Sequence, residues 1–269
     1  MRGGCVAIDA ILARIAAHPI EGTPEEMRAA FERLMGETPQ GKEVEVGGGP
    51  ALALGTGPTV MFLHGGGYIF GSPRSHMRAV ARLAANGLRV VAPSYRLAPE
   101  HVWPAQLEDA LAAYDALRPD GVLGISSGGH LALRLAMERG VGRLALLSPN
   151  TDRSGRSRTR ERNTPRDATV ADEDDCKLAE MALGHLADDD PVKSPLLADL
   201  SALPPLHLSV ASNEVLLDDT LLLARRAGIA GVETALHVAP GLFHMFHLWP
   251  DEIPVGGAAL DRVAAFLRG

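Results

Sequence analysis

A Gly-x-Ser-x-Gly pentapeptide, Gly124 to Gly128, constrains this chain more than any other feature of its sequence. It joins an apolar run, Val122 to Ile125, typical of the end of a buried strand, to His130 to Glu138, typical of an amphipathic helix. A serine at such a junction sits on a tight, strained turn that lifts its hydroxyl out of the backbone, and flanking glycines let neighbouring chain pack close. The pentapeptide alone also fits an ordinary turn. Its place between a strand and a helix makes Ser126 a candidate nucleophile.

A second glycine-rich segment also follows a strand-like run: Val60 to Leu63 leads straight into His64-Gly65-Gly66-Gly67-Tyr68. Consecutive glycines cost conformational entropy and leave backbone N–H groups uncovered, and such donors can stabilise a developing oxyanion. In the α/β-hydrolases, which this arrangement resembles, the N–H of the residue after the nucleophile completes the oxyanion hole. We therefore expect the N–H groups of Gly65, Gly66 and Ser127 to form it. A phosphate-binding loop is the alternative, but the motifs that accompany such loops are missing here.

The candidate base is His244. A serine nucleophile needs a histidine base, and in the α/β-hydrolases the acid and then the histidine follow the serine along the chain. His244 comes after a turn, residues 239–243, that follows a strand-like run, and a loop in that place lets a base swing over the nucleophile. His247 is the alternative. The other late histidines lie in strand-like runs or in a polar helical segment, and we expect them to be structural: His185, His207 and His237.

The candidate acid is Glu214, the first carboxylate after the strand-like run Leu206 to Val210. A triad acid orients the imidazole and stabilises its charged form. Asp218 is the alternative. However, Asp218 and Asp219 open the next helix, where carboxylates interact favourably with the helix dipole, and that is a sufficient structural reason for both. The sequence therefore predicts a triad of Ser126, His244 and Glu214.

Eight motifs in a fixed order give a resemblance to a known family. They are His64–Tyr68, Tyr95–His101, Pro104-Ala105 with Leu107–Ala110, Gly124–Gly129, Ser194–Leu196, Leu203–Pro205, Glu214–Asp218, and Pro240-Gly241 with His244 and Phe246. In these motifs the chain resembles the hormone-sensitive-lipase-like group of α/β-hydrolases, also called the family IV bacterial esterases. The resemblance implies hydrolysis of carboxylic esters with small or short acyl groups through a Ser-His-Glu triad and an acyl-enzyme. It implies no metal and no cofactor.

Three positions depart from the usual pattern of that family. Ile125 and Ser127 stand where the family usually has Asp and Ala, and the acid is Glu214 where Asp is more common. The nucleophile and the oxyanion donor survive these changes, because the donor is a backbone N–H. We expect the departures to affect substrate range and rate rather than the type of reaction.

Other functions stay open on this sequence. The same triad could hydrolyse a lactone, an amide or an aryl formamide. Some proteins of this fold are non-enzymatic ligand receptors, but loss of the serine or the histidine would signal that, and this chain keeps both. A carboxylesterase-like dehydratase, in which the oxyanion loop serves an elimination, is the third alternative.

Strand-like and helix-like runs alternate along the chain, which predicts an α/β fold with a mostly parallel, eight-stranded sheet covered by helices on both faces. The expected strands are residues 42–46, 51–54, 59–63, 88–92, 121–125, 143–147, 206–210 and 234–238. The first two are placed to form an antiparallel hairpin around residues 47–50. The expected helices of this core are residues 74–85, 104–117, 127–138, 216–227 and 257–267.

Two segments stand outside this alternation, approximately residues 1–40 and 150–195. In the family, the corresponding segments form a small helical cap over the active site. The first segment is predicted to contain two helices, and the second of these starts at Thr23-Pro24-Glu25-Glu26, a typical helix start. In the second segment, a helix opens at the acidic run Asp172 to Asp175. Met181 and Leu183 of that helix are candidates for lining the substrate pocket.

The second segment also carries six arginines between Arg153 and Arg166. A run of like charges is usually solvated and repels itself, so we expect a solvated, mobile lid loop. Binding of an anionic substrate or partner is the alternative.

Composition agrees with a small-molecule enzyme. A chain of 269 residues with 46% hydrophobic residues suits a single α/β-hydrolase domain with a sizeable core, and two cysteines make no disulfide framework. The net charge of −7 argues against a nucleic-acid partner.

The apolar stretch Val6 to Ala17 is too short and too charged to span a membrane and has no signal-peptide pattern. We expect a cytoplasmic enzyme, and the alternation in residues 234–238 permits a homodimer through that sheet edge.

Overall fold

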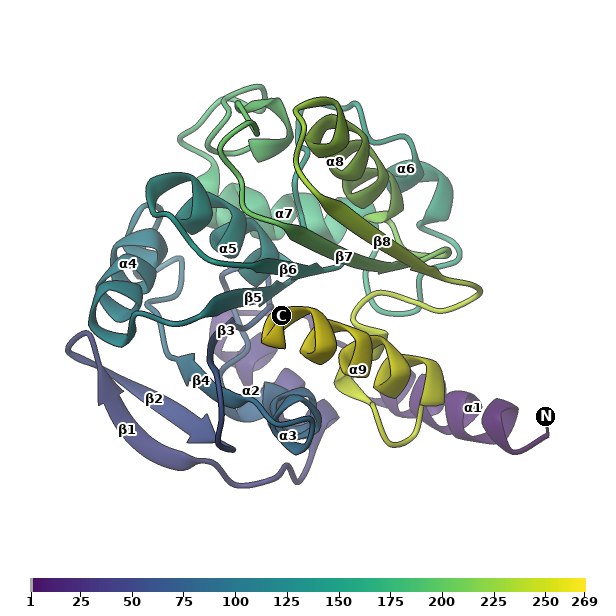
Figure 1. The fold of residues 1–269 in the computed structure, drawn as a ribbon. Helices are drawn as coiled ribbons and strands as arrows, with labels where there is room; N and C mark the ends of the chain where they lie inside the picture. Colours follow the sequence, from purple (N-terminus) through teal and green to yellow (C-terminus); the bar gives the residue numbers. More distant parts are fainter. Residues whose placement is uncertain (1) are drawn as a thin grey trace.

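The computed structural model describes residues 2–269, with side chains from residue 7 onward; Met1, the first residue of the predicted cap segments, lies outside the described residues. Its core is an eight-stranded sheet in the order β1-β2-β4-β3-β5-β6-β7-β8 (Figure 1). The strands are β1 (Lys42–Val46), β2 (Gly49–Leu54), β3 (Thr59–Leu63), β4 (Arg89–Pro93), β5 (Gly121–Ile125), β6 (Leu144–Leu147), β7 (Leu206–Ala211) and β8 (Thr234–Ala239). The eight predicted strands are confirmed, with small shifts of their ends.

All strands of the sheet run in one direction except β2, which is antiparallel to both of its neighbours. β1 and β2 form the predicted antiparallel hairpin, and β2 runs antiparallel to β4, whereas β4, β3, β5, β6, β7 and β8 are all parallel. The central strands β5 and β6 are buried at every residue, because helices cover both faces of a parallel sheet. This explains why the central strands are continuous apolar runs in the sequence.

Helices cover both faces of this sheet (Figure 1). α3 and α9 lie side by side on one face, while α4 and α5 pack together on the other. The helices are α1 (Arg2–Ala17), α2 (Pro24–Met35), α3 (Met77–Ala85), α4 (Ala105–Leu117), α5 (Ser127–Glu138), α6 (Thr159–Asn163), α7 (Asp172–Leu183), α8 (Leu217–Ile229) and α9 (Pro254–Arg268), with 3-10 turns at Arg74–His76, Pro195–Leu197 and Phe246–Leu248. None of the helices within residues 2–269 combines the length and the apolar composition that crossing a membrane requires.

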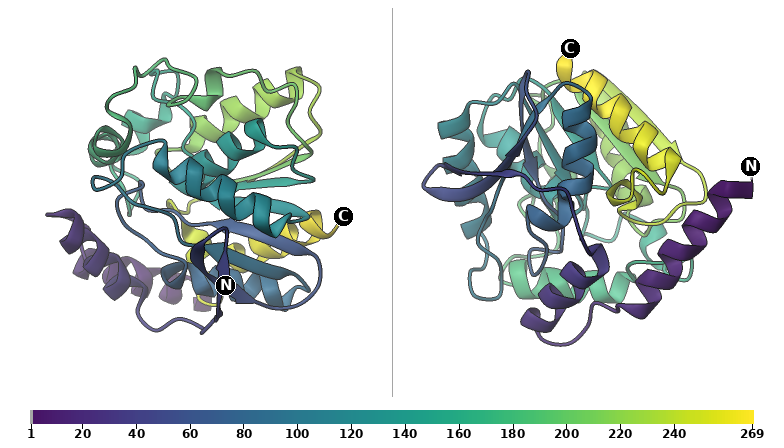
Figure 2. Two further views of the ribbon diagram at one scale, coloured as in Figure 1. Left: turned by 90° about the vertical axis from the view of Figure 1, so that its left-hand side faces the viewer. Right: turned by 90° about the horizontal axis from the view of Figure 1, so that it is seen from below.

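The two predicted cap segments contain α1 and α2, and α6 and α7. α2 begins where the sequence predicted, because the Thr23 hydroxyl accepts the Glu26 N–H while the Glu26 carboxylate accepts the Thr23 N–H. α1 extends outward at the margin of the molecule (Figure 2). The short helix α6 was not predicted, because five residues are too few to show a helical period in the sequence.

The arginine-rich segment is not uniformly solvated, so the expected solvated loop is wrong for two of its six arginines. Arg160 is almost fully buried and donates two hydrogen bonds to Asp219 on α8, at 3.1 and 2.8 Å. It also donates to Asp175 on α7 at 2.7 Å, and Arg153 pairs with the same carboxylate at 2.8 Å. The remaining four are exposed: Arg156, Arg158, Arg162 and Arg166. The buried pairs attach α6 to both α7 and α8.

The edge strand β8 leaves the side chains of Leu236 and Val238 exposed, at 42% and 38%. An exposed apolar edge can pair with another strand. The homodimer through this edge stays a prediction.

Replacing Arg160 by alanine should strongly destabilise the fold, because Asp219 would stay buried without its partner cation. Breaking one half of a buried ion pair typically costs about 3–5 kcal/mol of unfolding free energy. The matched control is Arg162→Ala on the same helix, whose exposed side chain should change stability by no more than about 0.5 kcal/mol. Chemical denaturation of both variants measures the difference. Equal effects would show that the buried pairs contribute nothing specific.

Candidate active site

The site begins at Ser126, between the last residue of β5 and the first residue of α5. Its backbone has φ 57° and ψ −122°, a strained conformation for a residue with a side chain. The flanking glycines make this turn fit: a Cβ on Gly124 would overlap the carbonyl of Gly128, and one on Gly128 would overlap the carbonyls of Leu63 and His64. The turn therefore packs directly against the end of β3, where the glycine-rich loop starts.

Ser126, His244 and Glu214 come together at this turn. His244 Nε2 lies 2.9 Å from Ser126 Oγ, and its Nδ1 lies 2.9 Å from a carboxylate oxygen of Glu214. With Nδ1–H donating to the carboxylate, Nε2 is free to accept the serine proton. The other Glu214 oxygen accepts hydrogen bonds from the Ser148 hydroxyl at 2.8 Å and the Ala211 N–H at 2.7 Å. The carboxylate is thus held from both sides.

The two alternatives for the acid and the base lie elsewhere. Asp218 accepts the backbone N–H groups of Arg158 and Thr159, so its carboxylate holds the start of α6. His247 is fully buried, and its Nε2 lies 2.9 Å from the Ser209 hydroxyl. Neither side chain contacts Ser126 in the described part of the chain.

The glycine-rich loop differs from the prediction at Gly65. Its N–H donates to His76 Nε2 at 3.1 Å and therefore does not face the site, so its expected role in the oxyanion hole is contradicted. Gly66 and Gly67 line the cavity next to Ser126, whereas Gly65 does not. Within the described residues, the N–H groups of Gly66 and Gly67 have no intramolecular acceptor. These two glycines, together with the N–H of Ser127 in the first turn of α5, are the donors the geometry leaves.

Two buried histidines hold this loop. His64 stacks on Tyr95 with ring centres 4.1 Å apart, and the Tyr95 hydroxyl donates to the His64 carbonyl at 2.7 Å. Burial lowers the pKa of His64 to about 4. Burial and the nearby His64 lower the pKa of His76 to about 3. Neutral His76 is the form that can accept the Gly65 N–H, so burial maintains the contact that positions the loop.

Ser148, His76 and Gly67 are site residues that the sequence analysis missed. Gly67 was visible as the third glycine of the run. Ser148 is 66 residues from its partner Glu214 in the sequence, and His76 is 11 residues from its partner Gly65. No local sequence pattern therefore identifies them.

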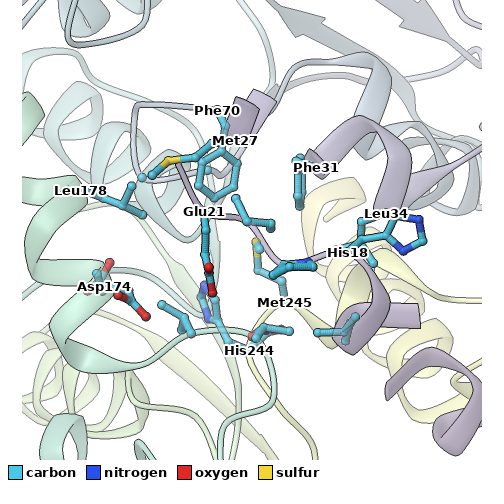
Figure 3. A pocket seen from close by; sticks show the side chains of 18 of the residues that line it. His18, Glu21, Met27, Phe31, Leu34, Phe70, Asp174, Leu178, His244 and Met245 are labelled. Carbon is cyan, nitrogen blue, oxygen red and sulfur yellow. Dashed lines mark hydrogen bonds between the residues drawn. The ribbon is translucent and has the colours of Figure 1, made fainter. Parts of the chain in front are cut away.

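Ser126 and His244 line a cavity of about 670 Å³. Figure 3 shows His244 among the side chains around it. Its walls come from the end of α1, the connection between α1 and α2, one face of α2, the loop before α7, and α7 itself. The apolar lining residues include Ile15, Ile20, Met27, Phe31, Leu34, Phe70, Leu178, Met245 and Trp249. Glu21, Asp174 and Lys177 add charge to the lining. The prediction that Met181 and Leu183 of α7 line the pocket was wrong. A different face of the helix, with Leu178, lines this cavity.

Both unusual residues beside the nucleophile point away from this cavity. Ile125 is fully buried in the core, and Ser127 faces a second, far smaller cavity together with Tyr68, His130 and Asn150. Neither side chain lines the large cavity, so their expected influence on substrate range would have to be indirect.

The chain is similar to known proteins of one fold family. A family described as "alpha/beta hydrolase fold" matches residues 60–248. An acetyl-hydrolase of Streptomyces hygroscopicus is 33% identical over 93% of this chain and 92% of its own length. An esterase of Acinetobacter venetianus is 29% identical over 90% of this chain and 88% of its own length. A crystal structure of an esterase from the bacterial hormone-sensitive lipase family superposes with a TM-score of 0.89 and 33% identity, covering 97% of each chain.

The reactivity of Ser126 should depend on the protonation of His244. Burial lowers the pKa of His244, but the hydrogen bond and negative charge of Glu214, together with Asp167 and Asp175, outweigh it, so the pKa is raised above 6.5. Only neutral His244 can accept the serine proton. Phosphonylation of Ser126 by an organophosphonate should therefore slow as the pH falls, with a midpoint above 6.5. Mass spectrometry measures the rate, and Ser126→Ala is the unlabelled control. A midpoint well below 6.5 would contradict this electrostatic argument.

Proposed function

Because this chain belongs to the hormone-sensitive-lipase-like esterases of the α/β-hydrolase superfamily, and is therefore a carboxylesterase-type hydrolase, we propose that it cleaves short-chain carboxylic esters through a Ser126-His244-Glu214 triad. One observation carries the proposal: two consecutive hydrogen bonds of 2.9 Å join the three side chains beside the large cavity. That arrangement is the one a serine nucleophile, its base and an orienting acid require.

The first half of the reaction forms an acyl-enzyme. His244 Nε2 removes the proton from Ser126 Oγ as that oxygen attacks the ester carbonyl carbon. The carbonyl oxygen becomes an oxyanion that accepts hydrogen bonds from the N–H groups of Gly66, Gly67 and Ser127; removing one such donor costs about 3–4 kcal/mol in comparable sites. The bond to the alcohol oxygen then breaks, and His244 gives its proton to the leaving alkoxide.

The second half returns the enzyme to its starting state. A water molecule takes the place of the alcohol, and His244 removes its proton as the water oxygen attacks the acyl carbon. The same backbone donors hold the second oxyanion. The bond to Ser126 Oγ breaks, the serine recovers its proton from His244, and the acid product leaves. Glu214 stays ionised throughout and stabilises the imidazolium in both halves.

The lining of the cavity supports an ester with an apolar acyl group. Met27, Phe31, Phe70 and Met245 enclose apolar space beside the nucleophile (Figure 3). Burial of an acyl chain against such side chains contributes about 0.8 kcal/mol per methylene. Two relatives support a short acyl group. One is an acetyl-hydrolase, and another is an ethyl acetate hydrolase of Pseudomonas putida, 33% identical over 73% of this chain.

Hydrolysis of p-nitrophenyl esters from acetyl to dodecanoyl tests the proposal. Turnover should peak at short acyl chains and disappear in Ser126→Ala, which should fold normally because the change removes only a hydroxyl. Retention of most turnover by Ser126→Ala would refute the nucleophile. A folded protein whose Ser126 reacts with an organophosphonate but that cleaves no ester in the series would refute the substrate class and direct the search to lactones and formamides.

Replacing the acid should separate Glu214 from Asp218. Glu214→Gln keeps the shape of the side chain but removes the charge that stabilises the imidazolium, and comparable changes lower kcat by about 10³- to 10⁴-fold. Asp218→Asn keeps an oxygen that can accept the N–H groups of Arg158 and Thr159, so kcat should fall no more than a few-fold. Steady-state kinetics on p-nitrophenyl acetate measures both. The reverse ranking would move the acid to Asp218.

A further inference from the structure

Asp167 lies in the loop between α6 and α7 and contacts the two loops that carry the proposed base and acid. One carboxylate oxygen accepts the backbone N–H of His244 at 3.1 Å. The other accepts the backbone N–H of Val215, the residue after Glu214, also at 3.1 Å. A single side chain from a predicted cap segment therefore links two loops that are about 30 residues apart in the sequence.

Neighbouring side chains reinforce this link. Thr169 donates its N–H and its hydroxyl to Asp167 at 3.2 and 2.9 Å, and that hydroxyl also lies 3.2 Å from the His244 carbonyl. Asn163, at the end of α6, donates to the carbonyls of Glu214 at 2.8 Å and Ser212 at 3.2 Å. Residues 163–169, which we call the brace, thus contact both the acid loop and the base loop through several hydrogen bonds.

The charge of Asp167 also faces the proposed base. The ionisable groups around His244 are Glu214 on the acid loop, Asp167 in the brace and Asp175 on α7, and all three favour its protonated form. Arg160 offsets part of the Asp175 charge by pairing with it. His247 also lies near His244, but burial lowers its pKa well below the ordinary value, so it stays neutral. Of these carboxylates, Glu214 bonds to the His244 imidazole and Asp167 to the His244 backbone N–H.

We propose that Asp167 is a positioning residue for the ester hydrolysis described above: it holds the base loop and the acid loop in register, and its charge favours the imidazolium that forms during catalysis. This inference rests on the proposed triad. It gives the brace a role opposite to that of a mobile lid, because the brace cannot move away without breaking contacts to His244 and Val215. Substrate would then enter past α1 and α2, which with their connection form another wall of the cavity.

Asp167→Asn tests the proposal, with Asp190→Asn as the matched control. Both aspartates lie in the same predicted cap segment and accept the N–H of the residue two positions later. Among the described residues, however, Val192 is the only hydrogen-bond partner of the Asp190 side chain. Because His244 and Val215 donate to different oxygens of Asp167, an Asn side chain would keep only one of these two acceptors and would carry no charge. We expect kcat on p-nitrophenyl acetate to fall about 10- to 100-fold with KM little changed, because the triad loses its register.

The pH profile separates positioning from a merely structural contact. Without the Asp167 charge, His244 should hold its proton less tightly, so the acid midpoint of kcat/KM should move to lower pH by up to about one unit. The midpoint does not depend on the amount of folded enzyme, so partial misfolding cannot imitate the shift. If Asp167→Asn yields no folded protein, Asp167→Ser, which also removes the charge but keeps a small acceptor, should show the same two effects. Asp190→Asn should match the wild type in both.

The pH midpoint of Ser126 phosphonylation, measured on the same variants, distinguishes this proposal from the proposed function. If the wild type cleaves no ester, the substrate class fails, but a lowered phosphonylation midpoint in Asp167→Asn still supports the role of Asp167. If the wild type is active and Asp167→Asn leaves kcat and both midpoints unchanged, the role of Asp167 is overturned. A fall in kcat with unmoved midpoints also overturns it, since a contact that only stabilises the fold would give that result.

Discussion

The close approach of two backbones is the constraint on which the rest of this site depends. Ser126 adopts a strained left-handed φ of 57°, and Gly128 lets the first turn of α5 lie against the carbonyls that end β3. Because β3 and β5 are adjacent parallel strands, their ends meet at the same edge of the sheet. Ser126 and the glycine-rich loop are therefore neighbours because the strands that precede them are neighbours in the sheet. The other elements of the site are placed relative to this contact.

Charge holds the outer parts of the site in place, whereas apolar packing builds the core. The sheet core is a continuous set of buried aliphatic and aromatic side chains. The arginine-rich segment, in contrast, is attached through Arg160 to Asp175 and Asp219, and through Asp167 to the loops of His244 and Glu214. Ion pairs with good geometry and low exposure specify one arrangement of a polar segment that has too few apolar residues to pack by itself.

The sequence predicted the architecture and three side chains of the site, because those depend on local patterns. The apolar runs located all eight strands, and the turns after them located Ser126, Glu214 and His244, which the structure brings together. Gly65 could not be assigned correctly, because its N–H is occupied by a side chain from another loop. The buried pairs of Arg160 were missed for a similar reason: a run of arginines looks solvated until its distant carboxylate partners are known.

The bond between Gly65 and His76 has a consequence for how the catalyst responds to acid. The buried histidines that hold the glycine-rich loop, His64 and His76, have pKa values lowered to about 4 and about 3, whereas the pKa of His244 is raised. Over the range in which His244 gains its proton, the loop histidines therefore take up none. Protonation of His244 alone should stop catalysis, while the glycine-rich loop keeps its conformation. A return to neutral pH should therefore restore activity without refolding of the loop.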